Sequence, residues 1–173
     1  MTEQPPRYAP ERALPPYAFV PGRDPHPTRD PRGHSFGQEE GGHDEGGAAW
    51  LPPERWSENG DYLFGVDLYN DGYLWEAHEA WEGLWHRAKH DGDQADHLQG
   101  LIQCAAACLK IAMEQPRGLE TLSRLGTEKL ERVARAHGGT YMGLDLFDFV
   151  ASMRAFAASS PTSADGRPRI FLD

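Results

Sequence analysis

The segment Ala95–Glu114 constrains the fold of this chain more than any other, because its apolar side chains surround most of a helix. At 100° per residue they cover a wide arc, made by Leu98, Leu101, Ile102, Ala105, Cys108, Leu109, Ala112 and Met113. A helix that is apolar on so many sides must be covered on several of them. We therefore expect this helix to lie in the middle of a bundle.

Four further segments have helical periodicity, and we predict helices over about 61–69, 73–89, 117–136 and 146–157. Their ends have suitable residues: Gly72 and the pair Gly138–Gly139 stop helices, and Pro116 suits a first turn. No repeat, heptad or parallel-sheet pattern occurs in the sequence. The expected fold class is all-α, an antiparallel bundle of about five helices with short connections.

Proline divides the chain into parts, since 11 of its 14 prolines lie before residue 54. We predict a Pro/Gly-rich extended arm and flexible linker over residues 1–56, a helical bundle domain over 57–160 and a short extended tail over 161–173. In the arm, Tyr17, Phe19 and Val20 have strand-like spacing, and residues 37–47 have the acidic, glycine-rich composition of a linker. We expect the apolar tail Arg169–Leu172 to pair with the arm.

Charge and composition restrict the function classes. A formal net charge of −10 argues against a nucleic-acid partner. No apolar run is long enough to span a bilayer and no secretory signal is present, so we expect a cytoplasmic protein with no membrane partner. Cys104 and Cys108 lie in the central apolar helix, where they are expected to be packing atoms and neither a disulfide nor a thiol metal site.

The candidate site lies in the helix predicted over 73–89. His78 and Glu82 are one helical turn apart, so the imidazole and the carboxylate project from the same face. Trp81 and Trp85 form a second such pair, beside the histidine. A histidine and an acid at the border of a tryptophan-lined packing face are typical of a partly desolvated polar site.

The central helix keeps one narrow polar stripe, which contains Gln99, Gln103 and Lys110. Polar groups on a buried helix need partners, and Glu79 and Glu82 are the nearest candidates. We expect a polar seam between the two helices. The seam is interpreted either as a functional site or as a buried hydrogen-bond network, with a Lys to Glu pair that sets helix register.

A divalent metal ion is the cofactor that His78 and Glu82 suggest, with zinc, manganese or iron as candidates. The zinc-protease pattern His-Glu-x-x-His is not met, because its second histidine is replaced by Glu82. At least one more protein ligand is needed. The candidates come from the arm, from the facing helix and from the same helix, and they are His26, His34, Gln99, Gln103, Glu79 and His86. In catalysis, Glu79 or Glu76 would take a proton from water, and Lys110 or the glutamines would orient a substrate.

The same residues resemble a known family. The segments 69–72 (Tyr-Asn-Asp-Gly, containing Asn70), 76–79, 81–85 and 99–110 are similar to a small bacterial and archaeal family, the domain of unknown function 309. The resemblance covers residues 58–113 well and 114–157 loosely. Its members are often labelled metal-dependent hydrolases. The family motif is a histidine, three residues, a glutamate, two residues and an aromatic, which implies metal binding at His78 and Glu82 with Trp85 as the aromatic.

Two hypotheses about function follow, from different classes. The first is a metal-dependent hydrolase that acts on a small-molecule substrate. The second is a non-catalytic helical module, in which the same residues form a buried network and the arm mediates assembly, including assembly into a homo-oligomer. A small-ligand binder or sensor is a third alternative.

Overall fold

The protein is a bundle of α-helices with an ordered arm at one end of the chain and an ordered tail at the other. The computed structural model describes residues 4–38 and 49–173. The described helices are, in chain order, the 3-10 helix η2 (Pro53–Glu58), α1 (Gly60–Asn70), α2 (Leu74–Ala88), α3 (Gly92–Ala112), α4 (Pro116–His137), α5 (Leu146–Ala158) and the 3-10 helix η3 (Ala164–Gly166). The predicted all-α class is confirmed, and the five predicted α-helices are found within three residues of their expected ends.

Side-chain caps explain where three of these helices begin. Asn59, Asp91 and Asp145 each accept a hydrogen bond from a backbone N–H three residues later, at 3.0 to 3.1 Å. These bonds satisfy donors that have no partner inside the helix. Gly138 ends α4 in the left-handed conformation, with a φ of 71°.

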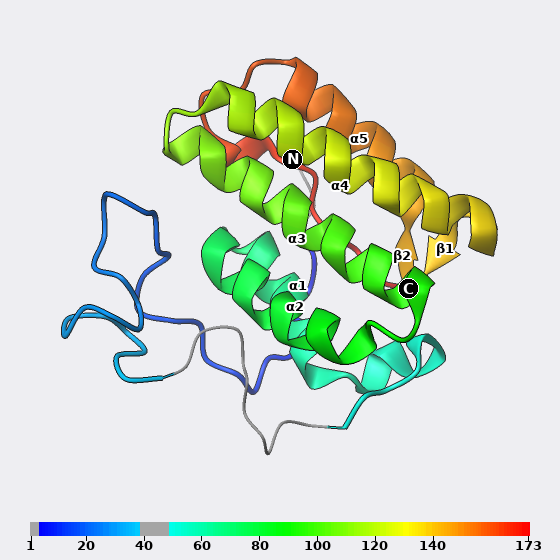
Figure 1. Ribbon diagram of the computed structural model, residues 1–173, viewed down its shortest axis with the longest axis horizontal. Helices are drawn as coiled ribbons and strands as arrows, with labels where there is room; N and C mark the ends of the chain where they lie inside the picture. Colours follow the sequence, from blue (N-terminus) through cyan, green and yellow to red (C-terminus); the bar gives the residue numbers. More distant parts are fainter. Residues whose placement is uncertain (1–3, 39–48) are drawn as a thin grey trace.

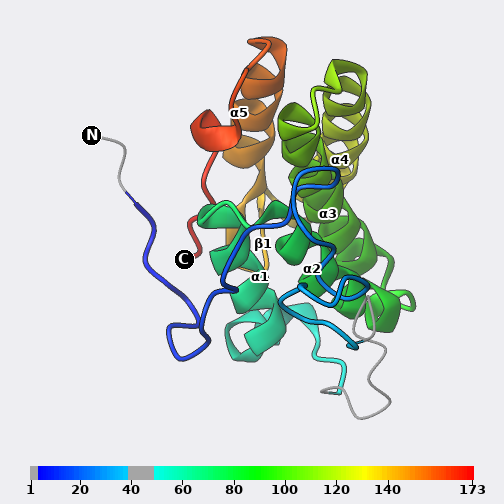
Figure 2. The ribbon, with the colours of Figure 1, turned by 90° about the vertical axis from the view of Figure 1, so that its left-hand side faces the viewer.

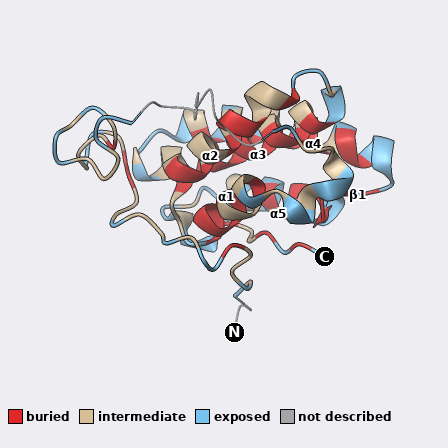
Figure 3. Ribbon diagram, turned by 90° about the horizontal axis from the view of Figure 1, so that it is seen from below, coloured by how far each residue is buried: buried red, intermediate tan, exposed pale blue. Residues whose placement is uncertain are grey.

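The central position predicted for α3 is confirmed. In Figure 1, α3 crosses the middle of the molecule, with α1 and α2 on one side and α4 and α5 on the other. Close approach of α3 to α4 depends on glycine: a Cβ atom at Gly100 would lie 2.6 Å from Leu130, and one at Gly126 would lie 2.9 Å from Cys104. Cys104 and Cys108 are buried free thiols in this core, as the packing interpretation expected. Figure 3 shows buried residues along the inward faces of the helices.

A short hairpin between α4 and α5 was not predicted. Strands β1 (Thr140–Tyr141) and β2 (Leu144–Asp145) pair antiparallel. Both turn residues between them, Met142 and Gly143, have positive φ, of 47° and 78°. Turns of this kind match the twist of a hairpin, but they usually contain asparagine or aspartate before the glycine. Because methionine occupies the first turn position here, the sequence does not contain the usual hairpin pattern.

The C-terminal tail adds to this hairpin and does not form a strand with the arm. Leu172 makes an antiparallel bridge with Leu144, which corrects the predicted strand pairing of tail and arm. The arm does reach the tail, through a hydrogen bond from the Leu172 N–H to the Tyr8 hydroxyl at 2.8 Å. Tail and arm are therefore in contact through the Tyr8 side chain and not through paired backbones.

The N-terminal arm lies along α1 and α2 as an irregular chain with many turns, as Figure 2 shows. Its described part buries Ala9, Phe19, Val20 and Pro27, so it covers part of the helical core. Most of the linker predicted over residues 37–47 lies outside the described residues. Among the residues that the structure describes, no helix has both the length and the apolar character needed to cross a membrane.

Candidate metal centre

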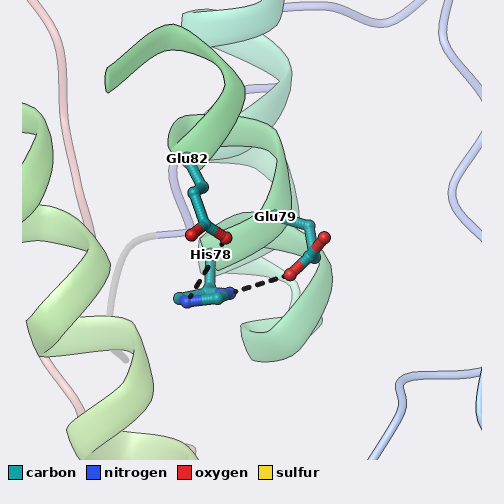
Figure 4. A group of neighbouring side chains, drawn as sticks. All are labelled: His78, Glu79 and Glu82. Atoms are coloured by element: carbon teal, nitrogen blue, oxygen red, sulfur yellow. Dashed lines mark ion pairs between the residues drawn. The ribbon is translucent and has the colours of Figure 1, made fainter. Parts of the chain in front are cut away.

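Three side chains of α2 form the candidate centre, His78, Glu79 and Glu82. The core-facing side of α2 buries Ala77, Trp81 and Leu84. The three polar side chains of the cluster remain half-buried on the other side of the helix. Figure 4 shows both carboxylates directed toward the imidazole. The closest distances are 3.3 Å from Glu79 Oε1 to His78 Nδ1 and 3.9 Å from Glu82 Oε2 to His78 Nε2.

The spacing of these three groups suits one cation. One donor atom from each residue can be chosen so that all three lie within 4.8 Å of one another. Two atoms that bind the same ion at about 2.0 to 2.2 Å are at most about 4.4 Å apart, so the side chains must move only slightly to bind. Their exposed fractions, 30% for His78, 19% for Glu79 and 33% for Glu82, leave room for such rotation and for water at the open coordination positions.

His78 has a nitrogen with incomplete hydrogen bonding. Its Nδ1 is buried and makes no hydrogen bond of good geometry, although Glu79 Oε1 lies 3.3 Å away. A buried polar atom without a hydrogen bond is costly. A cation between the imidazole and the carboxylates would satisfy it.

The two tryptophans of the motif differ in burial. Trp81 is completely buried, and its Nε1 donates to the carbonyl of Tyr62 at 3.3 Å. The ring packs so closely on Gly65 that a Cβ atom there would collide with it. Trp85 is half-buried, and the Lys89 ammonium lies 4.4 Å from its ring centre. Trp81 therefore fixes α2 against α1, whereas Trp85 covers the surface near the site.

Glu76, predicted as an alternative proton acceptor, is used elsewhere. It is 200° from His78 around α2, so it points to the opposite side of the helix. Its Oε1 accepts hydrogen bonds from the Phe19 N–H at 2.9 Å and from His34 Nε2 at 3.0 Å, while Oε2 is buried without a partner. Burial raises the pKa of the Glu76 carboxyl, and the bonds from Phe19 and His34 partly oppose this. Glu76 thus holds the arm.

The arm histidines are not brought to the cluster. His34 is paired with Glu76, and His26 lies edge-on to Trp75 and Phe19 on the same side. Within the described part of the chain, the group of potential ligands at His78 contains neither histidine. His86, the other histidine of α2 considered as a ligand, is likewise outside that group and contacts Trp85.

The facing helix makes fewer contacts with the cluster than the sequence suggested. Lys110 Nζ donates to Gln115 Oε1 at 3.0 Å, and the lysine stem packs where a side chain at Gly118 would lie. It forms no ion pair with Glu82 among the described contacts, so the predicted Lys to Glu pair is corrected. Gln99 and Gln103 are half-buried on α3, and Gln103 Oε1 is buried without a hydrogen-bond partner.

Asn70, predicted as a supporting residue, binds the tail. Its amide donates to the Ile170 carbonyl at 2.9 Å and accepts from the Ile170 N–H at 2.8 Å. Arg167 adds hydrogen bonds to the carbonyls of Tyr69 and Asn70 at the end of α1. This end of the helix is therefore a docking point for the tail.

Sequence reasoning missed several buried polar residues, among them Asp67, Gln94 and His97. His97 is completely buried, and burial lowers its pKa to about 3. Its Nε2 lies 3.2 Å from the Tyr62 hydroxyl, so the ring is a neutral core residue. The burial of His97 could have been predicted from its position one turn before Leu101, on the apolar side of α3.

Comparison with known proteins found one similar family. Residues 62–122 match the family model described as Domain of unknown function (DUF309). This segment is therefore similar to the DUF309 family. No curated protein and no solved structure matches the chain.

The DUF309 match extends from α1 to the first turns of α4, so it includes the whole His78, Glu79 and Glu82 cluster. The arm, most of α4, α5 and the tail lie outside it. The resemblance expected from the motif is thereby confirmed for residues 62–122. Three residues that contact the arm or the tail, Asp67, Asn70 and Glu76, lie inside the match.

Proposed function

We propose that the DUF309-like domain of this protein binds a divalent cation through His78, Glu79 and Glu82 and hydrolyses a small substrate there. The observation that carries the proposal is the convergence of one imidazole and two carboxylates on a half-exposed face of α2. Three protein ligands with open positions for water are typical of catalytic metal sites, whereas structural sites are closed by four.

The chemistry follows from the donor types. A divalent cation supplies Lewis acidity and lowers the pKa of water bound to it. Glu79 has two carboxylate oxygens, so it can bind through one and accept a proton through the other. Glu76 is excluded from this role, because its carboxylate points to the arm. The role of Lys110 in orienting a substrate stays a prediction, and in the structure its ammonium donates to Gln115 in an exposed contact.

The donor set also favours certain metals. A mixed nitrogen and oxygen set suits zinc, manganese and iron(II), while soft copper(I) prefers thiolates. Both thiols of the chain are buried in α3, and burial raises their pKa, which further disfavours thiolate ligands. We therefore expect zinc, manganese or iron(II).

Calorimetric titration of the full-length, tag-free protein with each metal tests the proposal, after treatment with chelator. We expect one ion per chain and a higher melting temperature, corresponding to about 2.7 kcal/mol when free metal is 100 times Kd. Hydrolysis is assayed with chromogenic esters and phosphoesters of p-nitrophenol. Absence of both binding and thermal stabilisation contradicts the metal site. Binding without hydrolysis of any ester contradicts only the catalytic half.

A second candidate, a non-catalytic helical module, is favoured by one observation. Polar residues of α1 and α2 hold the two ends of the chain: Asp67 and Glu76 bind the arm, and Asn70 binds the tail. A protein whose buried polar groups serve docking can act as an interaction module, including as a homo-oligomer. Light scattering with and without metal measures its oligomeric state.

A further inference from the structure

Both ends of the chain meet on the last turns of α1. Asp67 and Asn70 are three residues apart there and therefore lie on the same side of the helix. Asp67 receives the arm and Asn70 receives the tail. Figures 2 and 3 show the start of the described arm and the C-terminal tail on this same side of the bundle.

The arm is attached through a buried charge. Asp67, 1% exposed, accepts hydrogen bonds from the N–H groups of Tyr8 and Ala9, both at 2.8 Å. Arg7 Nε lies 2.9 Å from its second oxygen. A buried carboxylate needs partners of this kind, because an uncompensated charge in the interior is strongly unfavourable. Loss of the arm would leave Asp67 without them.

The tail is attached through paired hydrogen bonds and through packing. Ile170 is completely buried and exchanges two hydrogen bonds with the Asn70 side chain. Arg167, 4% exposed, covers the last carbonyls of α1, and its guanidinium lies 5.2 Å from the centre of the Tyr69 ring. These contacts involve no atom of the arm.

Arm and tail also contact each other. The Leu172 N–H donates to the Tyr8 hydroxyl at 2.8 Å, across 164 residues of sequence. A partly open pocket of about 150 Å³ is lined jointly by arm, helix and tail, with Arg7, Asp67, Asn70 and Arg169 among its lining residues. Each end therefore forms part of the surface on which the other end docks.

We propose that the N-terminal arm and the C-terminal tail dock on α1 as one cooperative unit, a strap in which release of either end loosens the other. Release of the arm removes the acceptor of Leu172 and takes away one wall of the shared pocket beside Asn70, which exposes more of it to water. Release of the tail removes the donor to Tyr8 and exposes more of the same pocket from the other side. Coupling of this kind is reciprocal, so both releases change the opposite end by the same factor.

Hydrogen exchange of backbone amides in the full-length protein tests the proposal. Arg7→Gln weakens the arm without altering α1, and the reporter is the Ile170 amide, whose bond to Asn70 does not involve the arm. We expect exchange at Ile170 to become at least about five-fold faster. In the reverse direction, Ile170→Ala should accelerate exchange at Ala9 by a similar factor.

Two controls separate coupling from general loss of stability. Glu11→Gln changes an exposed residue of the arm and should leave both reporters unchanged. Amides in the middle of α3, such as that of Ala105, should keep their protection in every variant. A chain that begins at Pro10 lacks the whole Asp67 contact and gives the largest effect. If Ile170 keeps its protection in that shortened chain, the two ends dock independently and the proposal is overturned.

Discussion

Glu76 Oε1 lies 3.0 Å from His34 Nε2, although 42 residues separate these two side chains in sequence. Both side chains are only 5% exposed, so their contact is part of the interior. The pair joins the arm to α2 two residues before His78. The helix that carries the candidate metal ligands is therefore supported on its opposite side by the arm.

Substitution of the candidate ligands should remove the effect of metal on stability. We expect His78→Ala and Glu82→Gln to abolish the rise in melting temperature with metal, while the metal-free protein changes by about 1 kcal/mol or less. The reason is that both side chains are half-exposed and Glu82 pairs only with His78 among the described contacts. Thermal melts with metal and with chelator measure both quantities.

Trp81→Ala is the matched control for these variants. It removes a fully buried ring and should cost about 3 to 5 kcal/mol with or without metal. A His78→Ala protein that still gains stability from metal would exclude His78 as a ligand.

Truncation of Glu76 should loosen the arm and leave metal binding intact. Glu76→Ala removes the acceptor of the Phe19 N–H and of His34, at a cost of about 1 to 3 kcal/mol. We expect trypsin to cleave sooner after Arg23, Arg29 and Arg32. Glu76→Gln, which keeps an acceptor oxygen, should have the smaller effect. Equal cleavage rates in all three proteins would show that Glu76 does not hold the arm.

Acidification should destabilise the protein through His97. Burial lowers the pKa of His97 in the folded state to about 3, whereas the unfolded chain has a pKa near 6.5. Between these values the unfolded state binds a proton that the native state does not, so stability is fully present above pH 6.5 and is lost as the pH falls. The slope from this residue approaches about 1.4 kcal/mol per pH unit.

Denaturant unfolding of the parent and of His97→Gln, from pH 7 to pH 4, measures this slope. Glutamine keeps a polar group for the Tyr62 hydroxyl but takes up no proton, so the variant should show the smaller slope. Parallel curves for the two proteins would exclude His97 as the cause.

The two thiols should be unreactive in the folded protein. Burial raises the pKa of Cys108 to about 12 and that of Cys104 further still, so little thiolate forms near neutral pH. We expect labelling by a disulfide reagent at pH 8 only on unfolding, at both cysteines. Rapid labelling of the native protein would show that α3 opens locally.

Sequence periodicity by itself determined the bundle, because the spacing of apolar residues specifies which side of each helix is buried. The wide apolar arc around Leu101 and Ile102 placed α3 at the centre, and the positions of Pro116 and Gly138 placed the ends of α4. The cluster of His78, Glu79 and Glu82 was also accessible from sequence, since helical geometry places residues three and four apart on one face, as in the pairs Glu79–Glu82 and His78–Glu82.

Contacts between distant segments were decided only by the tertiary structure. From the sequence, Glu76 and Lys110 were predicted to act in catalysis at the candidate site, and Asn70 was predicted to support it. The folded chain instead directs Glu76 to the arm, Asn70 to the tail and Lys110 to Gln115. The physical reason is that a polar side chain takes whichever partner the packed chain brings within about 3 Å. The partners of Glu76 and Asn70 lie 42 to 100 residues away in sequence, a separation about which local periodicity contains no information.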